Sequence, residues 1–307
     1  MKKAKMGLRG LRVQIHLWLG LTLGVIGALL GLSGSILVYD DVVDTWLNPQ
    51  RHALSGPQAA LPLSQYAQRA EQALANGARA ANIRLPDLEG GPVVVFVRAR
   101  GDTGGLQRIY LDPPTGRVLD AGTGNDFVAW LHNFHESLTL REYKGREIVG
   151  IVGIAMLISS LSGIYLWWPA GGVRRGTLGF RRSFALHRNL HYTFGIWGVI
   201  VLAMLSFTGI FLGFPEAGRA VMAAFGTVSP SPRGIQSPEG TGPAIGPDDA
   251  AAIARQRYPD AKVIGLGFPA GPRGVYRVNL RESGDTTSRA ATVMFIDPRS
   301  QAIRHQV

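Results

Sequence analysis

The sequence predicts a polytopic membrane protein, an α-helical bundle of three transmembrane helices that carries two small α+β domains outside the membrane. Three long stretches without a charged residue predict the helices. Two segments with the same order of features, a helix followed by short strands, predict the domains. Most of the seven histidines lie close to the apolar stretches, and they are the candidates for chemistry.

The apolar residues, 46% of a chain of 307, gather in three blocks. Residues 13–39, 148–168 and 194–214 contain no Asp, Glu, Lys or Arg, and each can span a hydrocarbon core of about 30 Å. We therefore predict transmembrane helices at 13–39, 148–168 and 189–214. The first block is longer than the roughly 7 to 15 apolar residues of a signal peptide, and no A-x-A site follows it, so we expect it to stay uncleaved.

Basic residues indicate the orientation of these helices, because Lys and Arg are retained on the cytoplasmic side. The N-terminus 1–12 and the loop 169–188 carry ten of them and no acid: Lys2, Lys3, Lys5, Arg9, Arg12, Arg174, Arg175, Arg181, Arg182 and Arg188. We expect both segments in the cytoplasm, and residues 40–147 and 215–307 outside. These ten residues explain most of the net charge of +11, so no nucleic-acid partner is indicated.

Two outer segments follow the same pattern. In 40–126, a helix at 63–75 precedes strands and a turn at Asp112–Gly116; in 248–307, a helix at 248–257 precedes strands and a turn at Asp297–Gln301. Residues 127–147 are predicted as an outer approach helix. Residues 215–247, rich in Gly, Pro and Ser toward their end, are predicted as a linker.

The histidines occur at both ends of the predicted bundle. His16 lies at the cytoplasmic start of the first helix, and His187 and His191 lie four apart, on one face, at the cytoplasmic start of the third. His132 and His135 lie three apart on the outer approach helix. If the first and third helices pack together, His16 faces His187 or His191, an arrangement that suits the two axial ligands of a haem iron. Spacing alone also leaves open a transition-metal site, a proton path and a structural role.

Other residue types narrow the chemistry. The chain has no cysteine, which excludes disulfides, thiolate catalysis, iron–sulfur clusters and cysteine-attached haem. Glycines in the first and third helices permit close helix approach or leave room for a flat macrocycle. They are Gly20, Gly24, Gly27, Gly31, Gly209 and Gly213.

Four patterns in order resemble the PepSY-associated transmembrane family of bacterial inner-membrane proteins. They are H-x-W-x-G from His16, L-H-x-x-H-E-x-L from Leu131, S-G-x-Y-L-W-W-P from Ser162 and L-H-x-x-x-G-x-W from Leu190. The two outer segments, 40–126 and 248–307, look like the PepSY domains of that family. The resemblance covers nearly the whole chain.

The resemblance implies a haem-binding inner-membrane protein similar to ferric-siderophore reductases, which pass electrons toward the periplasm for iron acquisition. It implies haem b as cofactor, with His16, His191 and His135 holding haem iron, and with His187 and His132 as further candidate ligands. Its implied partners are the lipid bilayer, a cytoplasmic electron donor and a ferric siderophore. The alternative is a non-redox membrane anchor whose PepSY modules bind or inhibit an envelope protein such as a protease.

The sequence departs from the family's usual pattern at one place. Members commonly continue into a fourth helix that supplies another histidine, whereas no further apolar block precedes Val307. We therefore expect one inner-leaflet haem, and a second outer haem only if another subunit supplies the missing helix. A truncated product is the other explanation.

Overall fold

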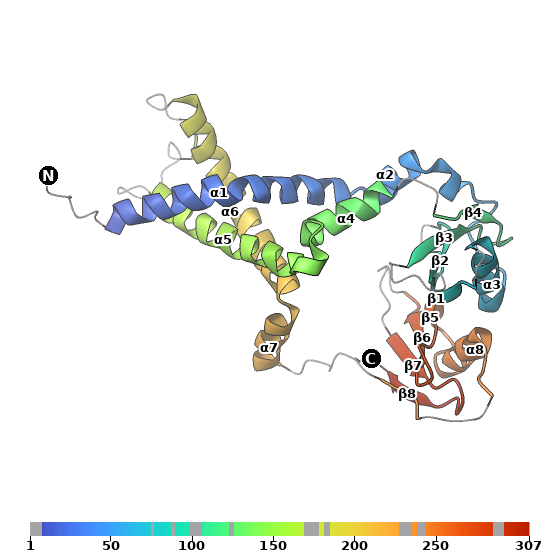
Figure 1. Ribbon diagram of the computed structural model, residues 1–307. Helices are drawn as coiled ribbons and strands as arrows, with labels where there is room; N and C mark the ends of the chain where they lie inside the picture. Colours follow the sequence, from blue (N-terminus) through green and yellow to red (C-terminus); the bar gives the residue numbers. More distant parts are fainter. Residues whose placement is uncertain are drawn as a thin grey trace, which may run out of the picture. The chain divides into compact units, whose positions relative to one another are not determined.

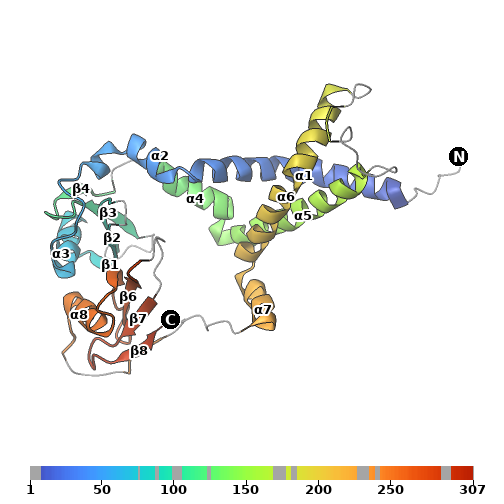
Figure 2. The same ribbon diagram turned by 180° about the vertical axis from the view of Figure 1, so that it is seen from behind.

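The computed structural model describes residues 8–74, 77–86, 90–98, 106–122, 126–168, 178–180, 185–226, 235–238, 243–284 and 292–306. The chain forms two compact units (Figures 1 and 2). The helical unit comprises Met1–Asp40 and Asp126–Val228, and the sheet unit comprises Asp41–Asn125 and Ser229–Val307. Each unit therefore combines segments that are far apart in the sequence.

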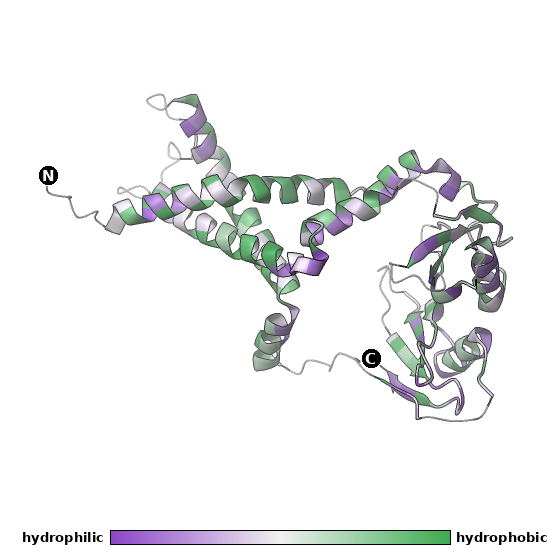
Figure 3. Cartoon of the chain, viewed as in Figure 1, coloured by the Kyte–Doolittle hydropathy of each residue, from purple (hydrophilic) through white to green (hydrophobic). Residues whose placement is uncertain are grey.

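Three long helices form the helical unit: α1 (Leu8–Leu37), α5 (Gly145–Trp167) and α6 (Leu186–Gly213). All three are long and apolar enough to cross a membrane (Figure 3), which confirms the predicted helices. Each begins three to five residues before its predicted start, because polar residues such as Arg12 and Arg146 extend a helix beyond its apolar stretch. Helix α5 packs against both α1 and α6 (Figure 1).

Helices α5 and α6 meet through a pair of glycines. A Cβ atom added to Gly213 would lie 2.6 Å from the Cα of Gly150, and one added to Gly150 would lie 3.2 Å from the Cα of Gly213. The two backbones therefore pack directly against each other. A Cβ atom on Gly209, one turn earlier in α6, would meet no described atom within 4 Å.

Helix α4 (Phe127–Ser137) packs against α1 and is followed by the short helix η2 (Arg141–Tyr143). The predicted approach helix over 127–147 therefore ends early. Leu138 and Lys144 take the left-handed conformation, with φ of 51° and 58°, and the chain turns tightly between them. Only glycine fits at position 145, because a Cβ atom there would lie 2.0 Å from the carbonyl oxygen of Ser137.

One helix occupies a segment that the sequence predicts as linker. Helix α7 (Pro215–Phe225) follows α6 directly. It begins with Pro215 in the first turn, where the missing proline N–H has no helical partner to lose. The residues that follow include several good helix formers, Ala and Met among them.

The sheet unit contains one antiparallel sheet with the strand order β4-β3-β2-β1-β5-β6-β7-β8. The strands are β1 (Arg79–Arg84), β2 (Val93–Arg98), β3 (Gln107–Leu111), β4 (Val118–Asp120), β5 (Lys262–Gly267), β6 (Tyr276–Arg281), β7 (Thr292–Ile296) and β8 (Ile303–Gln306). The two outer segments thus share a single sheet, joined where Ile83 of β1 pairs with Leu266 of β5. This pairing covers the backbone edge that each four-stranded half would otherwise expose.

Two helices, α3 (Leu63–Leu74) and α8 (Pro247–Arg257), lie on the same face of this sheet (Figures 1 and 2). Alternate strand residues such as Val93, Val95 and Val97 are buried beneath them, as their period of two predicts. The backbone N–H of Leu63 donates to the carboxylate of Asp248 at 2.6 Å, so α8 supplies a hydrogen-bond acceptor to the first turn of α3. The segment before α3 holds helix α2 (Asp40–Leu47) and the short helix η1 (Pro49–His52).

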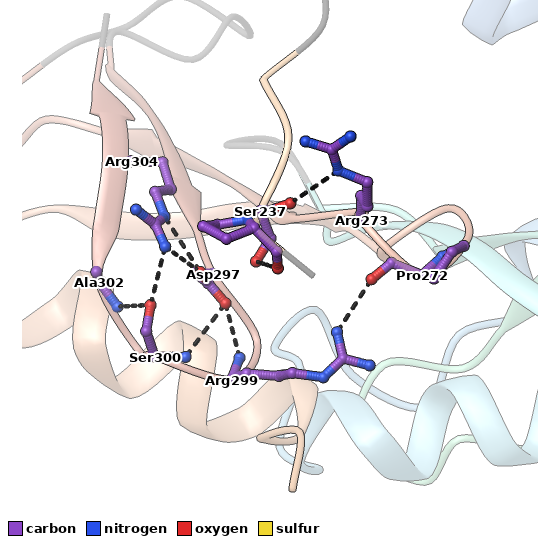
Figure 4. Close-up of polar contacts among 9 residues, drawn as sticks. Ser237, Pro272, Arg273, Asp297, Arg299, Ser300, Ala302 and Arg304 are labelled. Carbon is purple, nitrogen blue, oxygen red and sulfur yellow. Dashed lines mark hydrogen bonds and ion pairs between the residues drawn. The ribbon is translucent and has the colours of Figure 1, made fainter. Parts of the chain in front are cut away.

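The two predicted turns have matching geometry. The carboxylates of Asp112 and Asp297 are buried, and each carbonyl oxygen accepts a hydrogen bond from the residue four positions later. That residue has a positive φ in both turns, 63° at Gly116 and 58° at Gln301. Arg304 and the backbone N–H groups of Arg299 and Ser300 donate to the Asp297 carboxylate (Figure 4).

Candidate functional site

His16 and His191 face each other across α1 and α6. Their ring centroids lie 5.9 Å apart with an interplanar angle of 64°. Both residues lie near the N-terminal ends of their helices, so two helices that the sequence separates widely bring two imidazoles to one place. Metal–imidazole bonds are about 2 Å long, so two rings on opposite sides of one metal have centroids roughly 6 Å apart.

The third side of this site comes from α5. The Nδ1 atom of His16 lies 3.1 Å from Ser162 Oγ. The next residue is Gly163, where an added Cβ atom would lie 3.2 Å from His16 Cε1. The imidazole of His16 therefore packs against two consecutive residues of α5, Ser162 and Gly163, a pair that we call a Ser–Gly step.

His187, the alternative to His191, lies one turn earlier on α6. The side chains of His187 and His191 are both exposed, so exposure does not separate them. The ring contact does, because the structure brings His191 to within ring-contact distance of His16.

His135 occupies a similar site at the other end of α1. His135 belongs to α4, and its Nδ1 atom lies 3.0 Å from both Ser33 Oγ and the carbonyl oxygen of Leu30 in α1. A Cβ atom added to Gly34 would lie only 2.8 Å from His135 Cε1. Position 33 is about 26 Å further along α1 than position 16, at 1.5 Å per residue, so the two histidine sites lie at opposite ends of the helix.

His132 does not join His135. Its Nδ1 atom bonds to the Val128 carbonyl oxygen of its own helix at 3.1 Å, and its Nε2 atom lies 3.9 Å from the Asp40 carboxylate. Its two ring nitrogens are thus directed to other partners.

The remaining histidines belong to the sheet unit. His52 pairs with Asp44 at 3.3 Å, and Asp44 also accepts from Arg51 at 2.9 Å. Arg51 is buried, which by itself would lower its pKa, but its hydrogen bond to Asp120 at 2.6 Å contributes to a raised pKa. His305 lies beside Phe295. These contacts are structural and involve neither His16 nor His135.

Several sequence predictions concern residues outside the described ranges. They include Lys2, Lys3, Lys5 and the loop arginines Arg174, Arg175, Arg181 and Arg182. Among the described basic residues of these segments, the Arg12 guanidinium lies 4.3 Å from the ring centre of Tyr165. A basic and aromatic pair thus lies near the His16 end of α1.

The chemistry of the donor set fits a haem iron. Neutral imidazole is a common axial ligand, and helical bundles hold such ligands on facing helices. Within the described residues no three His, Asp or Glu side chains gather in one metal-binding group, but an iron held by a porphyrin takes only two axial ligands from the protein. His16 and His191 would supply both.

Sequence reasoning missed Ser33, Gly34, Ser162 and Gly163 as members of these sites. The signal was present as a repeated Ser–Gly step, once in the first apolar block and once in the second. The sequence does not indicate which histidine contacts each Ser–Gly step.

The fold and the histidines define a multi-pass helical membrane protein with an appended α+β unit. The model of the PepSY-associated transmembrane region matches residues 13–304, and the chain belongs to this family. Comparison with curated proteins gives no match to this chain.

Proposed function

We propose that this protein is a haem-binding inner-membrane protein that passes electrons toward the periplasm for iron acquisition, as ferric-siderophore reductases do. The observation that carries the proposal is the facing pair His16 and His191, from two different helices, with centroids 5.9 Å apart. A packing contact alone does not require two imidazoles at this place.

His16 and His191 would hold haem b near the cytoplasmic surface, and His135 would contribute to a second site near the outer surface. Haem, when bound, supplies reversible one-electron transfer at its iron. His16 lies toward one end of α1 and His135 contacts Ser33 toward the other end, a separation that would suit transfer across a membrane. The partners would be a cytoplasmic donor that docks near the basic loop 169–188 and a ferric siderophore in the periplasm.

The test is the absorption spectrum of the full chain, expressed with ample haem and purified in detergent. We expect a Soret band and an α-band that shift on reduction with dithionite. His191→Ala should lose most of the haem because it removes one of two axial ligands, whereas the matched variant His187→Ala, one turn away, should retain it. His52→Ala, in the sheet unit, is a second control.

The competing function is a non-redox anchor that displays its α+β unit to an envelope protein. It predicts no reducible Soret band, and it predicts that His16→Ala and His191→Ala behave like wild type. Equal haem loss in His191→Ala and His52→Ala would contradict the ligand assignment.

A further inference from the structure

The two Ser–Gly steps are built alike. In each, the serine hydroxyl reaches the carbonyl oxygen three residues earlier in its own helix: Ser33 to Leu30 at 2.9 Å, and Ser162 to Ser159 at 3.0 Å. In each, the same hydroxyl oxygen contacts the Nδ1 atom of a histidine from another helix. These contacts determine where the histidine proton lies.

The proton on His135 follows from its two acceptors. The Leu30 carbonyl oxygen has no proton, so its 3.0 Å contact with Nδ1 is a hydrogen bond only if Nδ1 carries one. Ser33 Oγ uses its single proton toward the same carbonyl and accepts from Nδ1 through a lone pair. In the neutral imidazole, Nε2 is then the unprotonated nitrogen.

The same reasoning applies to His16. Ser162 Oγ has one proton, and it donates this proton to the Ser159 carbonyl oxygen. Its 3.1 Å contact with His16 Nδ1 coexists with that bond only when the imidazole donates. Nε2 of His16 is again left with the lone pair.

The glycines bring the rings close enough for these bonds. A Cβ atom at Gly34 would lie 2.8 Å, and one at Gly163 3.2 Å, from the Cε1 atom of the histidine in front of it. Glycine beside the serine therefore lets the imidazole lie against the helix. By contrast, Thr208–Gly209 in α6 has a similar composition, and Thr208 Oγ1 bonds to the Leu205 carbonyl, yet no described atom lies within 4 Å of a Cβ added to Gly209.

We propose that Ser162 and Ser33 are positioning residues that hold His16 and His135 with the proton on Nδ1, so that Nε2 is the nitrogen offered to a metal at both ends of α1. Metal-binding histidines generally donate the other ring N–H to a fixed acceptor, which orients the ring and makes it a stronger ligand. The identity of the metal as haem iron rests on the proposed function, whereas the tautomer does not.

The first test reads the tautomer directly, in the full chain expressed without haem and labelled with ¹⁵N-histidine in lipid bilayers. Solid-state NMR separates protonated from unprotonated ring nitrogens, and His16→Gln and His135→Gln assign the signals. We expect Nδ1–H with unprotonated Nε2 at both positions. Ser162→Ala should weaken this preference at His16 alone, and Ser33→Ala should weaken it at His135 alone.

Two neighbouring serines provide matched controls. Ser160 Oγ donates to Met156 and Ser35 Oγ donates to Gly31, both within their own helices. Ser160→Ala and Ser35→Ala should leave both tautomers unchanged, and Ser162→Thr, which keeps the hydroxyl, should restore the wild-type signal at His16. Protonated Nε2 in the wild type, or equal effects of Ser162→Ala and Ser160→Ala, would overturn the proposal.

The second test separates the proposal from the proposed function. In haem-loaded protein, Ser162→Ala should give a more positive midpoint potential than Ser160→Ala, because the His16 ring loses an acceptor and becomes a weaker donor to iron. If no haem binds, the proposed function fails while the NMR result still decides the tautomer. If haem binds and the two variants have the same potential and the same NMR signals, the serines are not positioning residues.

Discussion

At the scale of single residues, the Asp297 carboxylate shows how the sheet unit holds a buried charge. Burial by itself would raise its pKa, but hydrogen bonds from Arg304 and from backbone N–H groups hold the pKa well below the ordinary value of 3.8. Because the folded-state pKa is the lower one, the carboxylate stabilises the fold above about pH 4. That stabilisation is lost as the pH falls toward the folded-state pKa.

Asp297→Asn should therefore lower the free energy of unfolding of the sheet unit by about 2–3 kcal/mol at pH 7. The difference from wild type should shrink as the pH falls below 4. Urea unfolding between pH 7 and pH 3 measures this, with the exposed Asp260→Asn as control. A difference that stays constant with pH would show that the ionised form is not what stabilises the turn.

Gln301 provides a second prediction at this scale. It takes a φ of 58°, which is strained for any residue with a Cβ atom, while its counterpart Gly116 takes 63° without strain. Gln301→Gly should stabilise the sheet unit by about 0.5–1 kcal/mol.

The reciprocal change is the control. Gly116→Gln should destabilise the sheet unit for two reasons. The added Cβ atom would lie 2.7 Å from Leu61 Cδ1, and the positive φ at this position would strain the backbone of a residue with a side chain. Thermal unfolding of both variants checks the pair, and a lower melting temperature for Gln301→Gly would contradict the argument.

At the scale of helices, the backbones of α5 and α6 pack directly against each other at Gly150 and Gly213. Gly213→Ala should destabilise the helical unit by about 1–3 kcal/mol, because the new methyl group meets backbone that cannot rotate away. Thermal unfolding in detergent measures the change.

Gly209→Ala is the matched variant in the same helix. It meets no described atom within 4 Å and should be neutral or slightly stabilising, since alanine favours a helix over glycine by about 1 kcal/mol. Equal loss of stability in the two variants would mean that the Gly150–Gly213 contact does not hold the helices together.

At the scale of the whole molecule, the charge pattern predicts the orientation. Lys and Arg gather around the start of α1 and between the end of α5 and the start of α6, so we expect both regions in the cytoplasm and the sheet unit in the periplasm. An alkaline phosphatase fusion after Gln306 should be active, and a fusion at Ala185 should be inactive. The reverse pattern would refute both the orientation and the proposed direction of electron transfer.

The sequence by itself determined the three long helices, the two α+β segments and the family. Length, apolar character and a period of two are properties of continuous stretches, so they can be read before folding. Val93, Val95 and Val97 belong to the hydrophobic core as that period predicts, although Val94 between them is buried as well. The helix ends shifted by a few residues, and α7 was missed, because helix propensity extends past the apolar blocks.

Only the tertiary structure decided which residues from distant segments meet. It joined β1 to β5 in one sheet and brought His191 rather than His187 to His16. It also placed His16 and His135 against two of the three Ser/Thr–Gly pairs that lie within α1, α5 and α6. The third pair, Thr208–Gly209, has a similar local sequence, but no described atom lies within 4 Å of a Cβ atom added to its glycine. The physical reason is that a hydroxyl group and a neighbouring glycine provide a hydrogen-bond acceptor and space for an imidazole, whereas the packing of the helices decides whether a histidine lies there.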